Sequence, residues 1–310
     1  MKIAINGFGR IGRAVYKVIK QSYSNLEIIA INDLADNAVL EHLLKYDSVY
    51  GKYNGNLDNV KLLSKQDPAN LPWKDLDIDL VVESTGRFAD YNSSKAHLDA
   101  GSKKVLISAP CKGADIDHFI FGVNHEKYKN QKIISAGSCT TTALAHMIFK
   151  INNAFNIKKG FATTMHSYTN NQNLVDAPHK DLRRTRSANL SIIPTTTGAV
   201  KTIGKIIPEL DKKLDGIAVR VPTPIVSLID LVCYVEKKTN ADSINNLFGK
   251  NLCTKPLVSS DFKADPRPVI IDSEMTKIQD NLIKILGWYD NEYGYSVQLV
   301  KLLEYVINKK

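Results

Sequence analysis

The chain has 310 residues, of which 44% are hydrophobic, and a formal net charge of +9. This length fits one large domain or two ordinary ones, with enough apolar content to build their cores. The four cysteines, Cys111, Cys139, Cys233 and Cys253, form no CxxC or Cys/His cluster, so neither a disulfide framework nor a metal site is expected. We expect a cytoplasmic protein without a signal peptide or a membrane-spanning segment.

The positive charge is spread along the chain and is not gathered in one basic block among aromatic residues. Nucleic acid is therefore not the expected partner. An anionic small-molecule substrate accounts for part of the excess charge, and so does a merely solvated basic surface.

Short apolar runs alternate with helical patterns through the first part of the chain, which predicts βαβ units and a doubly wound parallel sheet. Strands are expected at residues 3–5, 28–31, 80–82, 105–107 and 133–134, with a helix around residues 11–19. This Rossmann-type α/β domain is expected to span residues 1–138 and to be completed by a C-terminal helix within 292–310. Ser296 can cap that helix, and its apolar face requires a partner in the first domain.

After Cys139 the apolar runs become longer and richer in β-branched residues. They lie at residues 161–166, 217–221, 225–235 and 282–289. Long strands with few helices between them predict an α+β domain with a mostly antiparallel sheet, over residues 139–291.

A Gly-x-Gly-x-x-Gly motif runs from Gly7 to Gly12, between the first expected strand and the first expected helix. Its glycines permit a tight turn, close approach of backbone amides to a pyrophosphate, and close helix packing. Asp33 ends the second strand, where a carboxylate accepts hydrogen bonds from a ribose and repels a 2′-phosphate. A plain glycine turn with a surface aspartate is the alternative. The pattern predicts NAD as cofactor, with Gly7, Gly9, Arg10, Ile11, Gly12, Asp33 and Ser108 at its site.

Cys139 is expected at a helix N-terminus, where the dipole and free N–H groups lower the pKa of a thiol. The other three cysteines are expected to be small buried apolar residues. His166 ends a predicted strand and is the candidate base for Cys139. A lone histidine is more often structural than catalytic, and the sequence does not show a contact between the two.

Seven sequence motifs follow one another along the chain from the N-terminal to the C-terminal part. They are NGFGRIG from Asn6, SCTT from Ser138, HSYTN from His166, HKDLRRTR from His179, IIPTTTGA from Ile192, RVPTP from Arg220 and WYDNEYGYS from Trp288. Together they resemble the phosphorylating, NAD-dependent glyceraldehyde-3-phosphate dehydrogenase family. The resemblance implies that the Cys139 thiolate attacks the aldehyde of a triose phosphate, with His166 as base. Hydride then passes to NAD, and inorganic phosphate opens the thioester to give 1,3-bisphosphoglycerate.

The resemblance also implies where anions bind. Thr169, Arg184 and Arg220 would hold the substrate phosphate, and Ser138, Thr140, Thr197 and Gly198 the inorganic phosphate. Arginine suits this task because its planar fork binds phosphate oxygens in pairs. Without the resemblance, the run at 183–186 is interpreted as a solvated charged loop. Asn291 would hydrogen-bond the nicotinamide carboxamide, and a homotetramer is implied.

Several positions depart from the usual pattern of the family. Ser135-Ala136-Gly137 stands where Ser-Asn-Ala is usual, and Thr142 replaces an asparagine, which would loosen the start of the catalytic helix. Gln66 stands where many members carry a basic residue, and Ala177 replaces a leucine in the loop that lines the cofactor pocket.

Two rival hypotheses remain. An erythrose-4-phosphate dehydrogenase resembles this family strongly, and turnover on the two sugar phosphates would separate them. A non-catalytic RNA-binding protein on the same fold would show salt-dependent nucleic-acid binding and no dehydrogenase activity.

Overall fold

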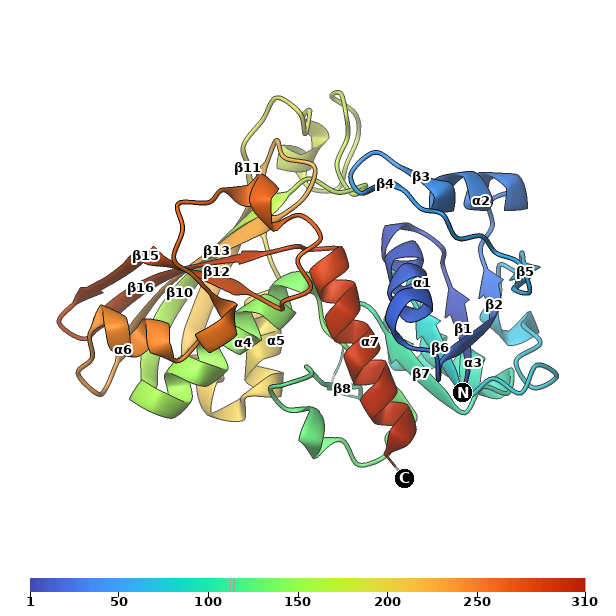
Figure 1. Cartoon of the computed structure of the whole chain (residues 1–310), viewed down its shortest axis with the longest axis horizontal. Helices are drawn as coiled ribbons and strands as arrows, with labels where there is room; N and C mark the ends of the chain where they lie inside the picture. Colours follow the sequence, from blue (N-terminus) through green and yellow to red (C-terminus); the bar gives the residue numbers. More distant parts are fainter. Residues whose placement is uncertain (112, 114, 310) are drawn as a thin grey trace. The chain divides into compact units, whose positions relative to one another are not determined.

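The computed structural model describes residues 1–111, 113 and 115–309, which form two compact units (Figure 1). The first unit contains Met1–Ser138 together with the chain from Ser296 onward, and the second contains Cys139–Tyr295. No helix of the described residues is long and apolar enough to span a membrane.

The first unit is built on a seven-stranded sheet in the order β5-β2-β1-β6-β7-β9-β8. Every neighbouring pair in it is parallel, as the sequence predicts. Its strands are β1 (Lys2–Asn6), β2 (Glu27–Asn32), β5 (Lys61–Leu63), β6 (Leu80–Glu83), β7 (Lys104–Ile107), β8 (Asp117–His118) and β9 (Ile133–Ser135). Its helices are α1 (Arg10–Ser22), α2 (Asn37–Lys45) and α3 (Tyr91–Asp99), and β3 (Tyr46–Asp47) and β4 (Gly51–Lys52) form a small hairpin. The strand order reverses between β1 and β6, the kind of point where open α/β sheets bind ligands.

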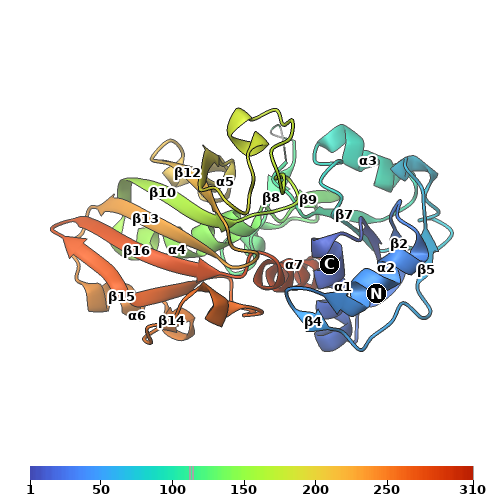
Figure 2. The ribbon, with the colours of Figure 1, turned by 90° about the horizontal axis from the view of Figure 1, so that it is seen from above.

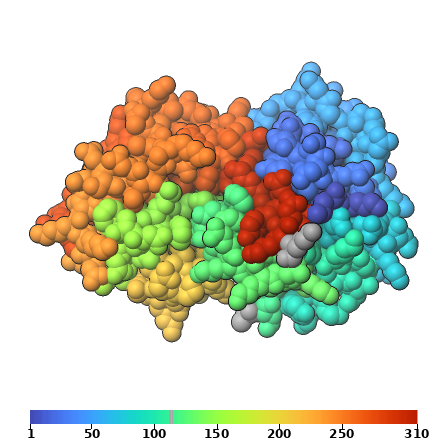
Figure 3. All heavy atoms as spheres, turned by 60° about the horizontal axis from the view of Figure 1, so that its bottom comes forward, coloured from blue at the N-terminus to red at the C-terminus, as the bar shows by residue number. Residues whose placement is uncertain are grey.

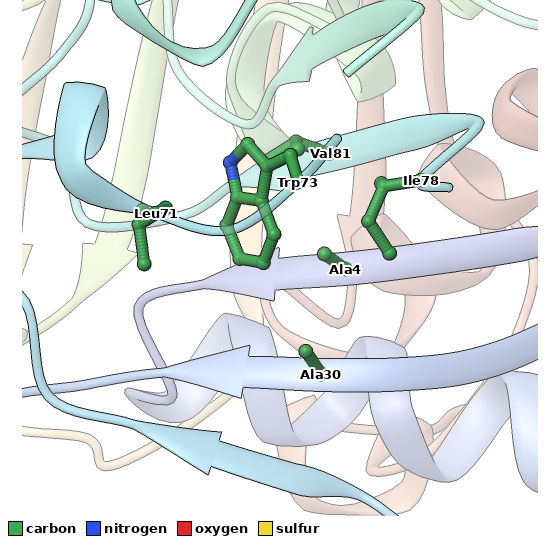
Figure 4. Close-up of a cluster of buried hydrophobic side chains, with 6 residues drawn as sticks. All are labelled: Ala4, Ala30, Leu71, Trp73, Ile78 and Val81. Carbon is green, nitrogen blue, oxygen red and sulfur yellow. The ribbon is translucent and has the colours of Figure 1, made fainter. Parts of the chain in front are cut away.

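Two small residues make room for a large one in the core of this unit (Figure 4). Ala4 of β1 and Ala30 of β2 are fully buried, and the indole of Trp73 packs over them without exposure to solvent. Trp73 also donates its Nε1–H to Nδ1 of His97 over 3.0 Å, so its one polar atom is satisfied.

The last helix, α7 (Tyr293–Asn308), closes the first unit. Nζ of Lys104 donates to the carbonyl of Val306 over 2.9 Å, and Figure 3 shows the helix beside the N-terminal residues. The expectation that Ser296 caps this helix is wrong. Oδ1 of Asp290 accepts the N–H groups of Glu292 and Tyr293 over 2.9 and 2.8 Å, so the helix begins one turn earlier and Ser296 is buried within it.

The second unit is built on a mixed sheet in the order β11-β12-β10-β13-β16-β15-β14. Its strands are β10 (Ile157–Ser167), β11 (Ile193–Thr196), β12 (Leu214–Val221), β13 (Ser227–Val235), β14 (Leu252–Cys253), β15 (Ile270–Gln279) and β16 (Leu282–Tyr289). The pairs β10–β12 and β14–β15 are parallel and the others antiparallel, so the sheet is mostly antiparallel as predicted.

Helices α4 (Cys139–Phe155) and α5 (Ala199–Ile206) pack against this sheet, and the short α6 (Ala241–Asn246) packs against β15 (Figures 1 and 2). β10 lies near the middle of the sheet and presents His166 close to its end. The parallel register of β10 and β12 sets His166 directly opposite Arg220. The sheet therefore brings together two residues that are far apart in the sequence.

Candidate active site

The glycine motif of the first unit forms a tight turn that begins α1. Gly7 has φ +93°, and a Cβ there would lie 2.7 Å from the backbone nitrogen of Thr85. A Cβ on Gly12 would lie 2.1 Å from the carbonyl oxygen of Gly7. A Cβ on Gly9, by contrast, would meet nothing within 4 Å, and no side chain among the described residues caps α1. The N-terminus of α1, which no side chain among these residues caps, therefore offers backbone N–H groups and the helix dipole to an anion.

A cavity of about 260 Å³ lies beside this turn. It is lined by residues at or just after the ends of β1, β2, β5 and β6: Asn6, Gly7, Gly9, Asn32, Asp33, Leu34, Lys65, Gln66, Ser84, Thr85, Arg87 and Phe88. The Asp33 carboxylate accepts the N–H of Phe8 over 2.7 Å and that of Ala35 over 3.0 Å. A carboxylate has about four acceptor positions, so Asp33 keeps capacity for ribose hydroxyls.

The other residues predicted for the cofactor are placed differently. The guanidinium of Arg10 lies 3.3 Å from the Asp47 carboxylate and 5.8 Å from the centre of the Tyr50 ring. Ser108 donates its N–H to the carbonyl of Glu83 over 2.9 Å. Among the described residues that line the cavity are Gly7, Gly9 and Asp33, but not Arg10, Ile11, Gly12 or Ser108.

A buried polar network supports the cavity and was not predicted from the sequence. Glu83 accepts Nδ2–H of Asn6 over 2.6 Å and the N–H of Thr85 over 2.8 Å, and it lies 3.0 Å from Nε2 of His97. Because Trp73 donates to Nδ1 of His97, that nitrogen is an acceptor and Nε2 carries the proton. His97 therefore donates to Glu83, and the network fixes Asn6 and Thr85, two residues that line the cavity.

In the second unit, α4 begins at Cys139, and its Sγ lies 3.4 Å from Nε2 of His166. Burial raises the pKa of the Cys139 thiol, and this outweighs the Arg220 charge and the N–H groups at the helix start, which lower it. The sequence predicted that the helix N-terminus lowers the pKa of this thiol, but desolvation has the larger effect and raises it. Cys111 and Cys233 are buried as predicted, but Cys253 is only half-buried.

The imidazole of His166 is almost fully buried on β10. Burial first, and the positive charge of Arg220 second, lower the pKa of His166 to about 3. Its Nδ1 lies 2.7 Å from the carbonyl oxygen of Ser167 and 2.8 Å from Nη1 of Arg220. At neutral pH the imidazole is therefore neutral and able to accept a proton.

Tyr289, which the sequence analysis did not single out, lies beneath this pair. Its buried hydroxyl is 2.9 Å from Oγ1 of Thr140 and 2.8 Å from Oγ1 of Thr164, and burial raises its pKa. Its position inside the WYDNEYGYS motif, next to the predicted Asn291, is the signal that could have found it. The tyrosine ties the first turn of α4 to β10 and so helps to hold Cys139 near His166.

Asn291 is oriented by two hydroxyl groups. Its Oδ1 accepts from Oγ of Ser167 over 2.9 Å and from Oγ of Ser227 over 3.0 Å. These bonds settle which end of the amide is the acceptor, and the NH₂ group is the end that can donate to a ligand.

The two predicted phosphate-binding arginines lie in different environments. Arg184 donates from Nε and Nη2 to Oγ1 of Thr195 over 3.1 and 3.0 Å, and from Nη1 to Asn171. Arg220 donates from Nη1 to the carbonyl of Ser167 over 3.0 Å, and its buried Nε has no hydrogen-bond partner in the described part of the chain. Burial and then the nearby charge of Arg184 lower the pKa of Arg220. Two close cations with spare donors favour an anion between them.

The remaining predicted phosphate residues lie at the starts of α4 and α5 and in the loop after β10. Thr197 accepts the N–H of Ala199 over 3.2 Å at the start of α5, and a Cβ on Gly198 would meet nothing within 4 Å. The carbonyl of Thr169 accepts the N–H of Gln172 over 2.9 Å, and Ser138 immediately precedes α4.

One departure from the family pattern has a local explanation. Gly137 has φ +64° and donates its N–H to Oγ of Ser135 over 3.0 Å, so glycine suits this turn better than alanine. Thr142 is buried within α4. The described residues contain no group of three or more His, Cys, Asp or Glu side chains that could hold a metal ion.

Comparison with known proteins adds an independent line of evidence. Residues 1–91 match the family model "glyceraldehyde 3-phosphate dehydrogenase, NAD binding domain", and residues 138–291 match the model of the C-terminal domain. The chain is 45% identical to a glyceraldehyde-3-phosphate dehydrogenase of Mycobacterium avium, over 99% of this chain and 98% of the relative. A relative of the same name from Streptomyces coelicolor is 43% identical over 100% of this chain and 99% of its own. The chain therefore belongs to the glyceraldehyde-3-phosphate dehydrogenase family.

Proposed function

We propose that this chain is a cytoplasmic, phosphorylating, NAD-dependent glyceraldehyde-3-phosphate dehydrogenase of glycolysis, with Cys139 as nucleophile and His166 as base. The 3.4 Å contact between Sγ of Cys139 and Nε2 of His166 carries the proposal. A thiol in contact with a neutral base, and the Arg220 cation in contact with that base, suit acyl transfer through a thioester. The first unit serves as the cofactor domain and the second as the catalytic domain.

The neutral thiol and imidazole set the sequence of proton transfers. As Sγ of Cys139 attacks the aldehyde carbon, Nε2 of His166 takes the thiol proton and passes it to the carbonyl oxygen, which gives a thiohemiacetal. The N–H of Cys139 and the transient imidazolium stabilise the negative oxygen on the way. His166 then takes the hydroxyl proton as the thioester forms. Inorganic phosphate displaces Sγ from the acyl carbon, and the product is the acyl phosphate.

The cavity of the first unit fits NAD, which supplies the hydride acceptor when it is bound. The open space at Gly9 and the uncapped N-terminus of α1 accept the pyrophosphate, with Arg10, Ile11, Gly12 and Ser108 as further contacts. Asp33 accepts the ribose hydroxyls and repels a 2′-phosphate. In the second unit, the NH₂ group of Asn291 donates to the nicotinamide carboxamide.

Arg220, Arg184 and Thr169 bind the phosphate of the triose substrate, and Ser138, Thr140, Thr197 and Gly198 bind inorganic phosphate. The two guanidinium groups carry most of the attraction for these anions, since hydrogen bonds to charged groups are roughly twice as strong as neutral ones.

A homotetramer is part of the proposal. The loop between β10 and β11 exposes large apolar side chains, with Leu182 82% and Leu190 87% accessible. On β10, Phe161 is 68% exposed. Apolar side chains presented in this number to solvent support association with further copies of the chain.

Replacement of the nucleophile tests the proposal. Cys139→Ser should abolish oxidation of glyceraldehyde 3-phosphate and leave NAD binding nearly intact, because a hydroxyl is a far weaker nucleophile near neutral pH. Cys253→Ser is the matched control, since Sγ of Cys253 donates to the carbonyl of Lys255 on β14's side of the sheet and not to a residue of the candidate site, and it should keep full activity. Oxidation that survives in Cys139→Ser would overturn the assignment. A higher kcat/KM on erythrose 4-phosphate would change the substrate and leave the mechanism intact.

A further inference from the structure

The side chain of Glu83, at the end of β6, is the point on which a buried hydrogen-bond network of the first unit converges. One of its oxygens accepts the N–H of Thr85 over 2.8 Å and the hydroxyl of the same residue over 2.5 Å. The other oxygen accepts Nδ2–H of Asn6 over 2.6 Å and Nε2–H of His97 over 3.0 Å. A carboxylate has about four acceptor positions, and these donors occupy them all. Glu83 is therefore an ionised group that only accepts, although it is 1% exposed.

The network runs from Glu83 across β1 and β2 to the loop after β5. Because Glu83 only accepts, Asn6 turns its NH₂ group toward it, and its Oδ1 accepts Nδ2–H of Asn32 over 2.7 Å. Asn32 donates from Nδ2 to the carbonyl of Lys65 over 2.9 Å, and its Oδ1 accepts the N–H of Lys65 over 2.8 Å. The orientation of each amide is therefore set by the group before it, starting from the carboxylate.

The same carboxylate holds the loop after β6. Since Oγ1 of Thr85 donates to Glu83, it is free to accept the N–H of Arg87, which lies 3.0 Å away. His97 supports Glu83 from the other side, and Trp73 fixes the tautomer of His97 by donating to its Nδ1 over 3.0 Å. The hydrogen bonds of both loops thus take their direction from one buried charge.

The two loops are walls of the cofactor cavity. Five members of the network line that cavity: Asn6, Asn32, Lys65, Thr85 and Arg87. The strand order β5-β2-β1-β6 places the loops after β5 and β6 on the two sides of it. Asp33, which is proposed to accept the ribose hydroxyls, follows β2 between them. The part of NAD that lies between these loops is therefore its adenosine half.

We infer that Glu83 is a positioning residue for the adenosine half of NAD, because its carboxylate directs the hydrogen bonds that hold both walls of the cavity. His97 and Trp73 act on the ligand through Glu83. The inference rests on the proposed function, which makes this cavity the NAD site. The network lies in the first unit, whereas Asn291, which is proposed to bind the nicotinamide, lies in the second. Changes in the network should therefore alter the affinity for the cofactor and not the rate of the chemical step.

Hydrogen–deuterium exchange of Glu83→Gln without ligand tests whether one residue controls both loops. Whichever way it is turned, glutamine presents an NH₂ group to donors. Flips of Asn6 and Asn32 relieve this conflict at Glu83 but set the NH₂ group of Asn32 against the N–H of Lys65. We expect exchange to accelerate several-fold in peptides that cover residues 64–66 as well as in those that cover 84–88. Acceleration at 84–88 alone, or at neither, would overturn the inference.

Calorimetric titration with NAD and with ADP-ribose tests the effect on the ligand. ADP-ribose has the same adenosine half and no nicotinamide. Glu83→Gln should weaken the binding of both by the same factor, at least about tenfold, because buried donors around the cavity lose their acceptor. The KM for NAD should rise, and kcat at saturating NAD should stay within about twofold of the wild type. Unchanged affinity for ADP-ribose, or a loss in kcat alone, would contradict the positioning role.

A second substitution at Asn6 should rescue the first. Asn6→Asp alone places two carboxylates at the 2.6 Å contact and should weaken NAD binding too. In Asn6→Asp/Glu83→Gln the charge moves by one position. The new amide donates to the new carboxylate, Nε2 of His97 lies 3.4 Å from the same position, and both bonds from Thr85 are kept. The double variant should bind NAD more tightly than either single variant. Affinity no better than that of Glu83→Gln would refute the network.

A matched pair at His97, which does not line the cavity, decides the matter if Glu83→Gln fails to fold. His97→Gln and His97→Leu both remove the ring, but only glutamine carries a donor for Glu83 and an acceptor for Trp73. His97→Gln should bind NAD and ADP-ribose several-fold more tightly than His97→Leu, and equal affinities would count against the inference. A wild type that binds neither ligand would refute the proposed function. Wild-type binding without any response in these variants would refute only the role of Glu83.

Discussion

Gly9 and Gly12 belong to one motif but should fail in opposite ways when each is replaced by alanine. At Gly12 the new Cβ would lie 2.1 Å from the carbonyl oxygen of Gly7, about 1.3 Å inside van der Waals contact. The turn has no room to yield, because Gly7 is itself packed against the backbone of Thr85. Overpacking costs roughly 1–3 kcal/mol, and a clash between two backbones belongs at the upper end, so Gly12→Ala should lose about 3 kcal/mol of unfolding free energy.

At Gly9 the new Cβ meets nothing within 4 Å, and φ is −67°, which alanine adopts without strain. The unfolding free energy of Gly9→Ala should therefore stay unchanged or rise by about 0.4–1 kcal/mol, because alanine restricts the unfolded chain. The methyl group instead occupies the space proposed for the pyrophosphate. We expect NAD affinity to fall at least ~100-fold, or about 2.7 kcal/mol.

Urea unfolding without ligand and calorimetric titration with NAD measure the two effects separately. Gly9→Ala should keep a normal unfolding free energy and bind NAD weakly, whereas Gly12→Ala should lose both stability and NAD affinity. Wild-type NAD affinity in Gly9→Ala would show that the open space is not where the pyrophosphate binds. A loss of unfolding free energy in Gly9→Ala as large as that in Gly12→Ala would show that the space around Gly9 is not open.

Three further predictions concern charges. Arg220→Ala should lower kcat/KM for glyceraldehyde 3-phosphate by an amount that corresponds to about 2–3 kcal/mol of transition-state binding. The loss for unphosphorylated glyceraldehyde should be much smaller. Equal losses for the two substrates would make Arg220 a structural residue. The wild type should prefer NAD over NADP at least about tenfold in kcat/KM, or ~1.4 kcal/mol, and Asp33→Gly should reduce this preference. Equal kcat/KM values for the two cofactors in the wild type would show that Asp33 does not face the ribose. Because the folded-state pKa of His166 is about 3 and the unfolded value is about 6.5, the unfolded chain binds the extra proton between these values, and stability falls as pH drops through that window. His166→Asn should remove up to about 1.4 kcal/mol per pH unit of that loss in urea unfolding, and an unchanged slope would contradict the lowered pKa.

The central strands could be predicted because burial on both faces produces continuous apolar runs. β15 (Ile270–Gln279) could not, since its apolar run ends after two residues and Met275 and Ile278 stand singly among polar side chains. The start of α7 was misplaced for a related reason. The apolar face begins after Ser296, but the chain turns helical at Tyr293 because the Asp290 carboxylate accepts the N–H groups of Glu292 and Tyr293.

At the site, the sequence identified Cys139, His166 and Arg220 separately, each by its motif. It could not place them together, because their contact depends on the register of β10 against β12 and on the position of α4 over the sheet. Tyr289 was missed because a buried tyrosine is ordinarily part of a core, and its hydroxyl contacts, among them those with Thr140 and Thr164, are visible only in the structure.

The pKa of the nucleophile shows why local position was not sufficient. A helix N-terminus favours a thiolate by about 0.3–1 kcal/mol at an exposed site. Desolvation acts against the charged form of both partners, since it raises the pKa of Cys139 and lowers that of His166. Both shifts oppose charge separation between the two side chains, whereas the Arg220 charge and the N–H groups at the start of α4 favour the thiolate. The helix start that the sequence reveals is therefore only one of several influences on the pKa of this thiol. The others depend on how β10, β12 and α4 pack around it, which no local sequence pattern shows.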